Sequence, residues 1–424
     1  MKYIFHLGRI PALSLAEIQA VFEKMKIDYT VDLIDSRFLI LDIEDKIDFE
    51  ELLPQVGGVI KIAKIIDNYK NLDDALEKTA FIIEDLNQKK SGKKIIGYSI
   101  YFTLNTDKNK VFEISENIKK KFIEIKKLCP KNSSIRIIFP DKNLEIKSVS
   151  VFKNKMIKKG GEFNFMFLNA PHPNPLPQGE GVILSKTIAV QDIESYSQRD
   201  YNRPKKDVKI GMMPPKLAQI MINLAQVRKG ATILDPFCGI GTILQEALLN
   251  DYRVVGSDAN GEQIVSSKEN LKWLETKYVL EYPDYKIFQA DTKSITKKIK
   301  QNSIDAIVTE STLGPVYKKV PSKIEIRHNY NLFIKMYTSF FQIAKSILRK
   351  KGRLVITIPA YKMKDGKFIT APFIDRLEKI GYSIVSPLSK EFLTEDIEIT
   401  DRNSIIYYRQ NQIVAREVFV FENK

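Results

Sequence analysis

Three aspartates in the second half of the chain each end a stretch that is predicted to be a β-strand. They are Asp235, Asp258 and Asp291, and the first opens the segment Asp-Pro-Phe-Cys-Gly-Ile-Gly-Thr at residues 235–242. Ligands of open α/β sheets bind at the carboxyl ends of the strands, and the two glycines let the backbone turn tightly and approach a ligand. The helix that follows them offers backbone amides to an anionic group. We therefore expect a ligand site where these strands end.

The chemistry of this site favours S-adenosylmethionine. Asp235 can bind the ammonium group, the amides can bind the carboxylate, and Asp258, 23 residues after Asp235, stands where an acid accepts bonds from both ribose hydroxyls. Asp291 can meet the adenine amino group. A dinucleotide site would need a third glycine at Leu244, and a P-loop would need a Gly-Lys-Ser/Thr ending, and the sequence has neither. Taken singly, each acid could instead be a helix cap or a turn residue. The predicted cofactor ligands are Asp235, Pro236, Phe237, Cys238, Gly239, Gly241, Thr242, Asp258 and Asp291.

The segments around these residues predict a parallel, doubly wound α/β sheet. Predicted strands alternate with helical segments, and they cover residues 232–235, 253–258, 286–291, 305–309 and 353–359. The last two predicted strands, residues 405–409 and 415–421, are separated by a short polar turn and should form an antiparallel hairpin. This combination is typical of class I, Rossmann-like methyltransferases. We assign it to residues 214–424.

The first 160 residues are predicted to form two α+β modules. In residues 1–60, strands at 3–7 and 38–43 surround a helix at 14–25, which a capping box of Ser14 and Glu17 should begin. In residues 61–160, a helix at 115–128 accompanies three strands, which cover residues 94–102, 134–139 and 148–152.

Residues 161–213 should connect these modules to the methyltransferase domain. Two predicted strands, 163–168 and 182–191, flank residues 169–181, whose four prolines and two glycines exclude a helix or a central strand. This loop resembles the peptide produced when interspersed bacterial repeats are translated in frame. We therefore expect a passive insertion, and we expect no catalytic role for His172.

The chain is basic, and its positive charge is unevenly distributed. The net charge is +15, but residues 1–85 hold 10 basic and 17 acidic side chains, whereas residues 86–160 hold 19 basic and 6 acidic ones. Phosphate contacts would use such a segment. A solvated lysine-rich surface is the alternative explanation.

Composition also excludes several classes of protein. No stretch of eighteen uncharged apolar residues occurs, and the N-terminal residues lack the features of a signal peptide, which favours a soluble, cytoplasmic protein without a membrane partner. Two cysteines and three scattered histidines predict neither a disulfide framework nor a metal site.

The segment at 235–242 resembles the motif of methyltransferases that modify exocyclic amino groups of nucleobases. Further segments resemble the THUMP-containing tRNA guanosine N2-methyltransferases that act at position 10, over nearly the whole chain apart from the proline-rich insertion. These segments are Thr-Ile-Ala-Val-Gln-Asp-Ile-Glu-Ser-Tyr at 187–196, Arg-Asp-Tyr-Asn-Arg-Pro at 199–204, Gly-Met-Met-Pro-Pro-Lys-Leu-Ala at 211–218 and Ile-Tyr-Tyr-Arg at 406–409. The resemblance implies an S-adenosylmethionine-dependent enzyme that methylates N2 of a guanosine in tRNA.

The resemblance also assigns the upstream modules. Residues 1–60 correspond to a ferredoxin-like domain and residues 61–160 to a THUMP domain, and the two bind tRNA in that family. The lysines of the basic module would then face phosphates and add affinity without reading sequence. The candidates are Lys153, Lys155, Lys158 and Lys159.

The family has an Asp/Asn-Pro-Pro-Tyr-like catalytic motif after the fourth strand. Here that place reads Thr-Glu-Ser-Thr-Leu-Gly-Pro-Val-Tyr at residues 309–317, without either expected proline and with Leu313 in place of an aromatic. Glu310 can replace the acid, the backbone carbonyl of Ser311 can be a second acceptor, and Tyr317 can supply a displaced ring. Alternatively, Glu310 is an ordinary strand-end acid and Tyr317 a packing residue.

Other functions stay open at this point. The chain could methylate ribosomal RNA or another tRNA position, or it could be a catalytically impaired tRNA-binding protein, and an accessory subunit is compatible with the sequence. Arg199, Asp200 and Arg203 could contact cofactor or tRNA, or could be surface charges of a linker. Cys238 has no histidine near it in sequence, so we expect it in the wall of the cofactor loop and not as a nucleophile.

Overall fold

The chain forms two compact units. The structure, a computed structural model, describes residues 1–89, 92–103, 106–128, 134–168, 181–206, 212–280, 283–410 and 412–424. The first unit contains Met1–Leu7, Asp28–Pro54 and Val59–Ile193. The second contains Gly8–Ile27, Gln55–Gly58 and Glu194–Lys424.

The second unit is built on a mixed sheet. Its strands are β9 (Thr232–Asp235), β10 (Arg253–Asp258), β11 (Tyr285–Gln289), β12 (Ile304–Glu310), β13 (Leu348–Lys362), β14 (Phe368–Ile369), β15 (Tyr382–Val385), β16 (Ile405–Tyr407) and β17 (Val414–Asn423). The main path runs β11-β10-β9-β12-β13-β17-β15, with β14 paired to β13 and β16 to β17. All pairs from β11 to β13 are parallel. The strand order reverses between β9 and β12, which is where ligands bind in such sheets.

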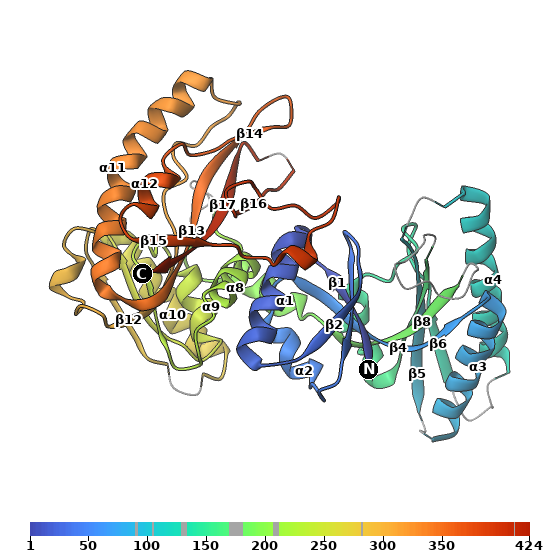
Figure 1. The fold of residues 1–424 in the computed structure, drawn as a ribbon. Coiled ribbons are helices and arrows are strands. Elements are labelled where there is room, and N and C mark those ends of the chain that lie inside the picture. The colour runs from blue at the N-terminus through green and yellow to red at the C-terminus, as the bar shows by residue number, and fades with distance from the viewer. Residues whose placement is uncertain are drawn as a thin grey trace. The chain divides into compact units, whose positions relative to one another are not determined.

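Helices cover both faces of this sheet (Figure 1). On one face, α11 (Lys323–Ile347), α12 (Ile374–Glu378) and the 3₁₀ turn η3 (Ile295–Lys297) close an aromatic-rich core that includes Phe340, Phe341 and Phe421. On the other, α9 (Thr242–Leu248) packs so closely on β10 that a Cβ at Gly256 would lie 2.5 Å from Leu244. Next to α9 lie α8 (Pro215–Leu224) and α10 (Gly261–Lys277). Short turns complete the unit: α7 (Ile193–Ser197), the π-helical η2 (Gln198–Asn202) and η4 (Lys390–Phe392).

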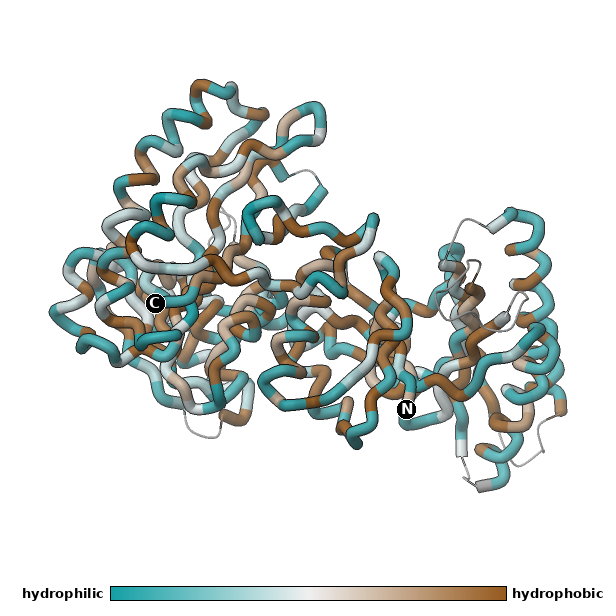
Figure 2. Tube along the Cα trace, in the orientation of Figure 1, coloured by the Kyte–Doolittle hydropathy of each residue, from teal (hydrophilic) through white to brown (hydrophobic). Residues whose placement is uncertain are grey.

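Hydropathy follows this layering (Figure 2). The strands are mostly hydrophobic along their length, whereas α11 alternates between hydrophobic and hydrophilic residues, as expected of a helix with one buried face. A capping box of Ser322 and Glu325 begins α11. The amphipathic pattern therefore explains why this long helix lies on the sheet.

The predicted doubly wound sheet and its antiparallel end are confirmed. The strands predicted at 232–235 and 253–258 have those bounds, and β16 pairs with β17 in an antiparallel hairpin. In addition, β17 inserts between β13 and β15, with antiparallel pairing to both. The sequence pattern did not reveal β15, because it has only four residues and no buried alternation.

The first unit is one eight-stranded sheet. Its strands are β1 (Lys2–Leu7), β2 (Tyr29–Ile34), β3 (Phe38–Ile43), β4 (Val59–Tyr69), β5 (Lys93–Phe102), β6 (Ser134–Ile138), β7 (Gly160–Phe167) and β8 (Val182–Val190), in the order β2-β3-β1-β4-β8-β7-β5-β6. The helices α3 (Leu72–Lys89) and α4 (Lys108–Lys127) cover one face (Figure 1). The remaining elements are α2 (Phe49–Leu52), η1 (Leu53–Gln55), α5 (Ser148–Lys153) and α6 (Met156–Lys159). The sheet continues through the predicted boundary near residue 60, since β4 spans it, and the domain names given to residues 1–60 and 61–160 stay predictions.

The helix predicted at 14–25 is α1 (Pro11–Met25), and it belongs to the second unit. The predicted capping box is wrong, because the helix starts at Pro11, a residue suited to the first helical position. Ser14 therefore lies inside the helix, and its Oγ accepts a hydrogen bond from the amide of Gly8 at 3.1 Å. Glu17 is fully buried and contributes to the packing of α1 against α8.

The strand predicted at 148–152 is also wrong, because this segment forms the helix α5. Alternating serine and valine favour a strand only weakly in a six-residue segment. Here Val151 is fully buried in a small cluster with Ile95, Ile146 and Met156, and this packing determines the conformation.

The predicted passive insertion at 169–181, together with His172, lies outside the described residues except for residue 181. Within the described part of the chain, no helix combines the length and apolarity needed to span a bilayer.

Candidate functional site

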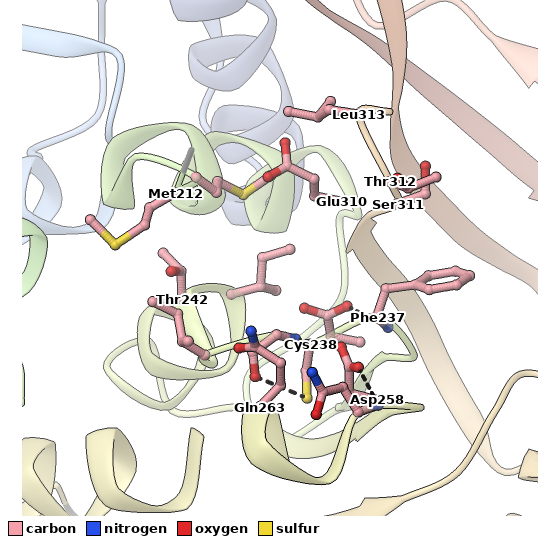
Figure 3. A pocket seen from close by; sticks show the side chains of 16 residues that line it. Met212, Phe237, Cys238, Thr242, Asp258, Gln263, Glu310, Ser311, Thr312 and Leu313 are labelled. Atoms are coloured by element: carbon pink, nitrogen blue, oxygen red, sulfur yellow. Dashed lines mark hydrogen bonds between the residues drawn. The ribbon is translucent and has the colours of Figure 1, made fainter. Parts of the chain in front are cut away.

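A cavity of about 350 Å³ opens at the carboxyl ends of β9, β10 and β12, where the sheet reverses its strand order. Figure 3 shows Met212 and Thr242 on one side, Asp258 and Gln263 at the bottom of the view, and Glu310 at the top. The lining residues are Met212, Met213, Asp235, Phe237, Cys238, Gly239, Ile240, Thr242, Ile243, Asp258, Asn260, Gln263, Glu310, Ser311, Thr312 and Leu313.

Asp235 ends β9 and is buried in the cavity wall. Its Oδ1 accepts hydrogen bonds from Thr309 Oγ1 at 2.6 Å and from the amide of Phe237 at 3.2 Å. Burial raises the pKa of Asp235 to about 8, and the nearby carboxylates of Asp258 and Glu310 push it in the same direction. Because a bound cation would favour the ionised form, Asp235 is suited to receive an ammonium group.

The loop after β9 depends on its glycines. Gly239 and Gly241 have φ angles of 50° and 86°, in the left-handed region that favours glycine. A Cβ at Gly241 would lie 2.5 Å from Ser267 Oγ, so this position also requires the absence of a side chain. The amide of Gly239 donates to Asp258 Oδ2 at 3.0 Å, which joins the loop to the end of β10.

Cys238 lies in this loop as a buried wall residue. Burial, together with the carboxylates of Asp235 and Asp258, raises the pKa of its thiol far above the usual value. The thiol therefore stays protonated, which does not suit a nucleophile.

The other predicted cofactor acids lie in different surroundings. Asp258 lines the cavity, and next to it Asn260 and Gln263 add polar groups that the sequence motif did not indicate. Asp291 is exposed and is not among the lining residues; its Oδ1 accepts a bond from the amide of Ser294 at 2.8 Å. Asp291 therefore caps a turn here, which is the alternative considered for each acid.

Glu310, the predicted catalytic acid, ends β12 and lines the cavity. Its carboxylate pairs with Arg416 of β17, whose Nε donates to Oε1 and whose Nη2 donates to Oε2 at 3.3 Å. Arg416 is only 2% exposed. A two-pronged contact of this kind fixes the carboxylate plane. The sequence did not reveal Arg416, because it lies 106 residues away on an antiparallel strand.

Ser311 lines the cavity beside Glu310, but its hydroxyl is bonded to that of Tyr337, so its backbone is the part left for the predicted acceptor role. Tyr317 is not among the lining residues. Its hydroxyl accepts a bond from Asn329, and its ring packs edge-on against Tyr361 with the centroids 6.0 Å apart. The structure therefore places Tyr317 as a packing residue.

Two arginines of the segment before α8 are buried, so they are not surface charges of a linker. Arg199 pairs with the buried Glu246, at 2.6 Å from Nε to Oε1. Arg203 donates from Nη1 to Thr242 Oγ1 at 2.6 Å and so reaches the cavity wall.

The predicted RNA-binding lysines occur in the first unit. Lys153, Lys155, Lys158 and Lys159 are all exposed, on or beside the consecutive helices α5 and α6. A surface of this kind can approach phosphates, and the predicted contact stays a prediction.

The cavity fits S-adenosylmethionine. Three carboxylates, those of Asp235, Asp258 and Glu310, line it, which suits a ligand that carries an ammonium group, a sulfonium and ribose hydroxyls. Among the described residues, neither a lysine nor an arginine lines the cavity. In the described part of the chain, His, Cys, Asp and Glu residues form no group of three that could hold a metal ion.

Comparisons with known proteins agree with this site. Residues 203–369 match the family model "RMKL-like, methyltransferase domain", and residues 86–269 match the model "DNA methylase". The chain is 33% identical over 188 residues to tRNA (guanine(10)-N2)-dimethyltransferase of Methanothermobacter thermautotrophicus, which covers 44% of this chain and 50% of that protein. It is 29% identical over 113 residues to human U6 snRNA (guanine-N(2))-methyltransferase THUMPD2, covering 26% and 21%.

Among solved structures, TrmN from Thermus thermophilus has a TM-score of 0.54 at 13% identity, and the match covers 100% of both chains. This likeness shows the fold alone. The aligned segments span half or less of the two curated relatives named above. The second unit has the class I methyltransferase fold, and the chain is similar over part of its length to guanine N2-methyltransferases that act on RNA.

Proposed function

We propose that this chain transfers a methyl group from S-adenosylmethionine to the exocyclic N2 of a guanosine in tRNA, at position 10. The observation that carries the proposal is the position of Glu310. Its carboxylate, held by Arg416, lines the same cavity as Asp235 and Asp258, the acids suited to the cofactor. The activity for which the Methanothermobacter relative is named supports the choice of base and position.

Methyl transfer to this nitrogen needs positioned acceptors. The lone pair of a guanine amino group is delocalised into the ring, so the nitrogen attacks well only when its hydrogens are held and the lone pair is turned toward the methyl carbon. Glu310 accepts one amino hydrogen with a lone pair that Arg416 leaves available, since a carboxylate has about four such sites. The backbone carbonyl of Ser311 accepts the other. Bound S-adenosylmethionine supplies an electrophilic methyl group.

The balance of the step is simple. The new bond would join N2 to the methyl carbon as the carbon–sulfur bond breaks, with the electron pair of that bond left on the sulfur of S-adenosylhomocysteine. The nitrogen would then lose one proton, which Glu310 can take up and pass to solvent. Positioning and electrostatics therefore supply most of the catalysis.

The first unit supplies the affinity for RNA in this proposal. Its segment at 86–160 carries the excess of basic residues, and the exposed lysines of α5 and α6 contact phosphates. We place this module in the role of the THUMP domain, and the protein in the cytoplasm with its tRNA.

Two observations favour second candidates. The human relative is named for U6 snRNA, so an RNA other than tRNA is one candidate substrate. In addition, Leu313 lines the cavity where an aromatic was expected and Tyr317 packs elsewhere, which favours weak transfer or RNA binding without transfer.

The test is mass spectrometry of nucleosides from unmodified tRNA, ribosomal RNA and U6 RNA after incubation with cofactor. We expect N2-methylguanosine or N2,N2-dimethylguanosine in tRNA with the wild type and a loss of more than about 100-fold in Glu310→Ala. Glu395→Ala, at an exposed glutamate, is the matched control. Methylation confined to another RNA would exclude the tRNA assignment, and no methylation of any RNA would exclude transfer.

A further inference from the structure

The loop after β12 packs onto the first half of α11. Leu313 lines the cavity, and one residue later a Cβ at Gly314 would lie 3.2 Å from the ring of Phe333. The side-chain amide of Asn329 then donates to the hydroxyl of Tyr317. The catalytic loop and the first half of α11 are therefore packed together as one structure.

This half of α11 lies at the same edge of the sheet as the cavity. Because α11 connects β12 to the parallel strand β13, it must begin near the carboxyl ends of the strands, where the cavity opens. Its Tyr330 donates a hydrogen bond to the carbonyl of Ile369 in β14 at 3.0 Å, and Figure 1 shows α11 reaching the end of the sheet where β14 lies. Lys318 follows Leu313 so closely in the chain that the two lie within about 18 Å of one another.

The exposed side of this region is strongly basic. Residues 311–335 contain five lysines and arginines and one acid, Glu325, and all five cations are exposed. Hydrogen bonds from Ser322, with a smaller contribution from Lys319, lower the pKa of Glu325, so this acid is engaged in the cap of the helix. The ion pairs among the described residues include none of the five cations. The basic face of α11 consists of Lys318, Lys319, Lys323, Arg327 and Lys335.

Exposed apolar side chains accompany the cations. Val316, Ile324 and Leu332 are 70%, 82% and 59% exposed. His328 is exposed as well, and helical spacing places it between Ile324 and Leu332. An RNA strand can use such a mixed surface, since its phosphates attract cations and its unpaired bases stack on histidine rings and guanidinium groups.

The cavity itself repels phosphates. Asp235, Asp258 and Glu310 line it with three carboxylates, and a guanosine that enters it brings its own phosphates toward these charges. Cations at the same edge of the sheet offset this repulsion. Resting on the function proposed above, we infer that the basic face of α11 is a second RNA-binding surface, located on the catalytic unit. It holds the RNA backbone where the target guanosine enters the cavity.

The test measures binding of unmodified tRNA to the full chain over a range of salt concentrations, without cofactor. The variant carries Lys318→Gln, Lys323→Gln and Arg327→Gln. If each cation contacts a phosphate, affinity at 0.15 M salt should fall by about 10- to 100-fold, and the slope of log K against log salt should flatten by about two to three. The charge-conserving variant Lys318→Arg, Lys323→Arg and Arg327→Lys should keep both values.

The matched control replaces Lys272, Lys277 and Lys350 by glutamine. These lysines are also exposed on the second unit, but they lie in the later part of α10 and at the start of β13, toward the amino ends of the strands. All three variants should bind S-adenosylhomocysteine as the wild type does, because none of the changed residues lines the cavity. This measurement also shows that the variants are folded.

The inference is overturned if the glutamine variant of the basic face binds tRNA with wild-type affinity and salt dependence, or if the control loses as much affinity. A wild type that binds no RNA would overturn both this inference and the proposed function. Binding that depends on the basic face, without methylation of any RNA, would contradict the proposed function alone. Methylation of tRNA by the wild type, with binding unchanged in the variant, would contradict this inference alone.

Discussion

At the scale of single residues, Asp235 should couple cofactor binding to pH. Its pKa of about 8 in the free protein means that the carboxyl is mostly protonated at pH 7, and an ammonium ligand must ionise it. Affinity for S-adenosylhomocysteine should therefore rise with pH up to about 8, by as much as tenfold per unit, and stop rising where the ligand amine itself deprotonates near 8.

Calorimetry in buffers with different ionisation enthalpies would show release of a proton on binding at pH 7. Asp235→Asn should bind weakly and without this pH dependence. An affinity that is constant between pH 6 and 8 would contradict the assignment of Asp235.

Arg416 should act through Glu310 and not through the cofactor. Removing its charge in Arg416→Met leaves the Glu310 carboxylate unsupported, so methyl transfer should slow by more than about tenfold while S-adenosylhomocysteine still binds. Because Glu310 already raises the pKa of Asp235, the pH midpoint of cofactor binding should also move upward.

Arg416→Lys should restore part of the rate, since lysine keeps the charge but loses the fork of donors. Arg349→Met, in an exposed ion pair with Asp305, is the control. If only stability changed, with neither the rate nor the pH midpoint affected, Arg416 would be a packing residue.

At this scale the sequence predicted what is local. The loop at 235–242 and Asp258 could be recognised because a strand, a turn and a helix place them at fixed spacing. Arg416 could not, since it matters through a partner 106 residues away in the chain. Arg203 was a candidate contact of cofactor or tRNA, but its bond to Thr242, 39 residues away, could not be predicted. Asp291 shows that local spacing can also mislead, because an acid that follows a strand can cap a turn instead of lining a ligand site.

At the scale of elements, α1 depends on one buried carboxylate. Glu17 Oε1 accepts from the amide of Gly57 at 2.9 Å and from Asn223 Nδ2 at 2.8 Å, and Oε2 accepts from the amide of Gly58 at 2.7 Å. Glu17→Gln replaces one of these oxygens by a donor that faces a donor. It should lower the free energy of unfolding at pH 5, where the contribution of Glu17 is still largely present, by about 1–3 kcal/mol.

Burial raises the pKa of Glu17 from its usual value of 4.5 to about 7. A raised pKa in the folded state means that its contribution to stability is present below about 4.5 and is lost as pH rises through about 7. Urea unfolding of the full chain between pH 5 and 8 would measure this slope, which Glu17→Gln should lack. Glu23→Gln, on the exposed part of the same helix, should behave as the wild type.

The strands of the second unit were predictable because buried parallel strands between helices leave a regular apolar pattern. The placement of α1 could not be predicted, since its local sequence indicates a helix but not the unit to which that helix belongs. The strand predicted near residues 148–153 was wrong for a related reason, because the packing of Val151 outweighed a weak preference for a strand.

At the scale of the whole molecule, the uneven charge should separate RNA binding from cofactor binding. Reversing Lys153, Lys155 and Lys158 to glutamate removes three exposed cations from α5 and α6 and their junction. If each contacts a phosphate, RNA affinity should fall, and the slope of log K against log salt should flatten by about two to three. S-adenosylhomocysteine affinity should not change, because these residues are not in the cavity lining.

The matched control reverses Lys46, Lys64 and Lys70, which are also exposed in the first unit but lie outside the basic segment at 86–160. Equal loss of RNA affinity in the two triple variants would mean that net charge alone attracts RNA, and no loss in either would place the RNA-binding surface elsewhere.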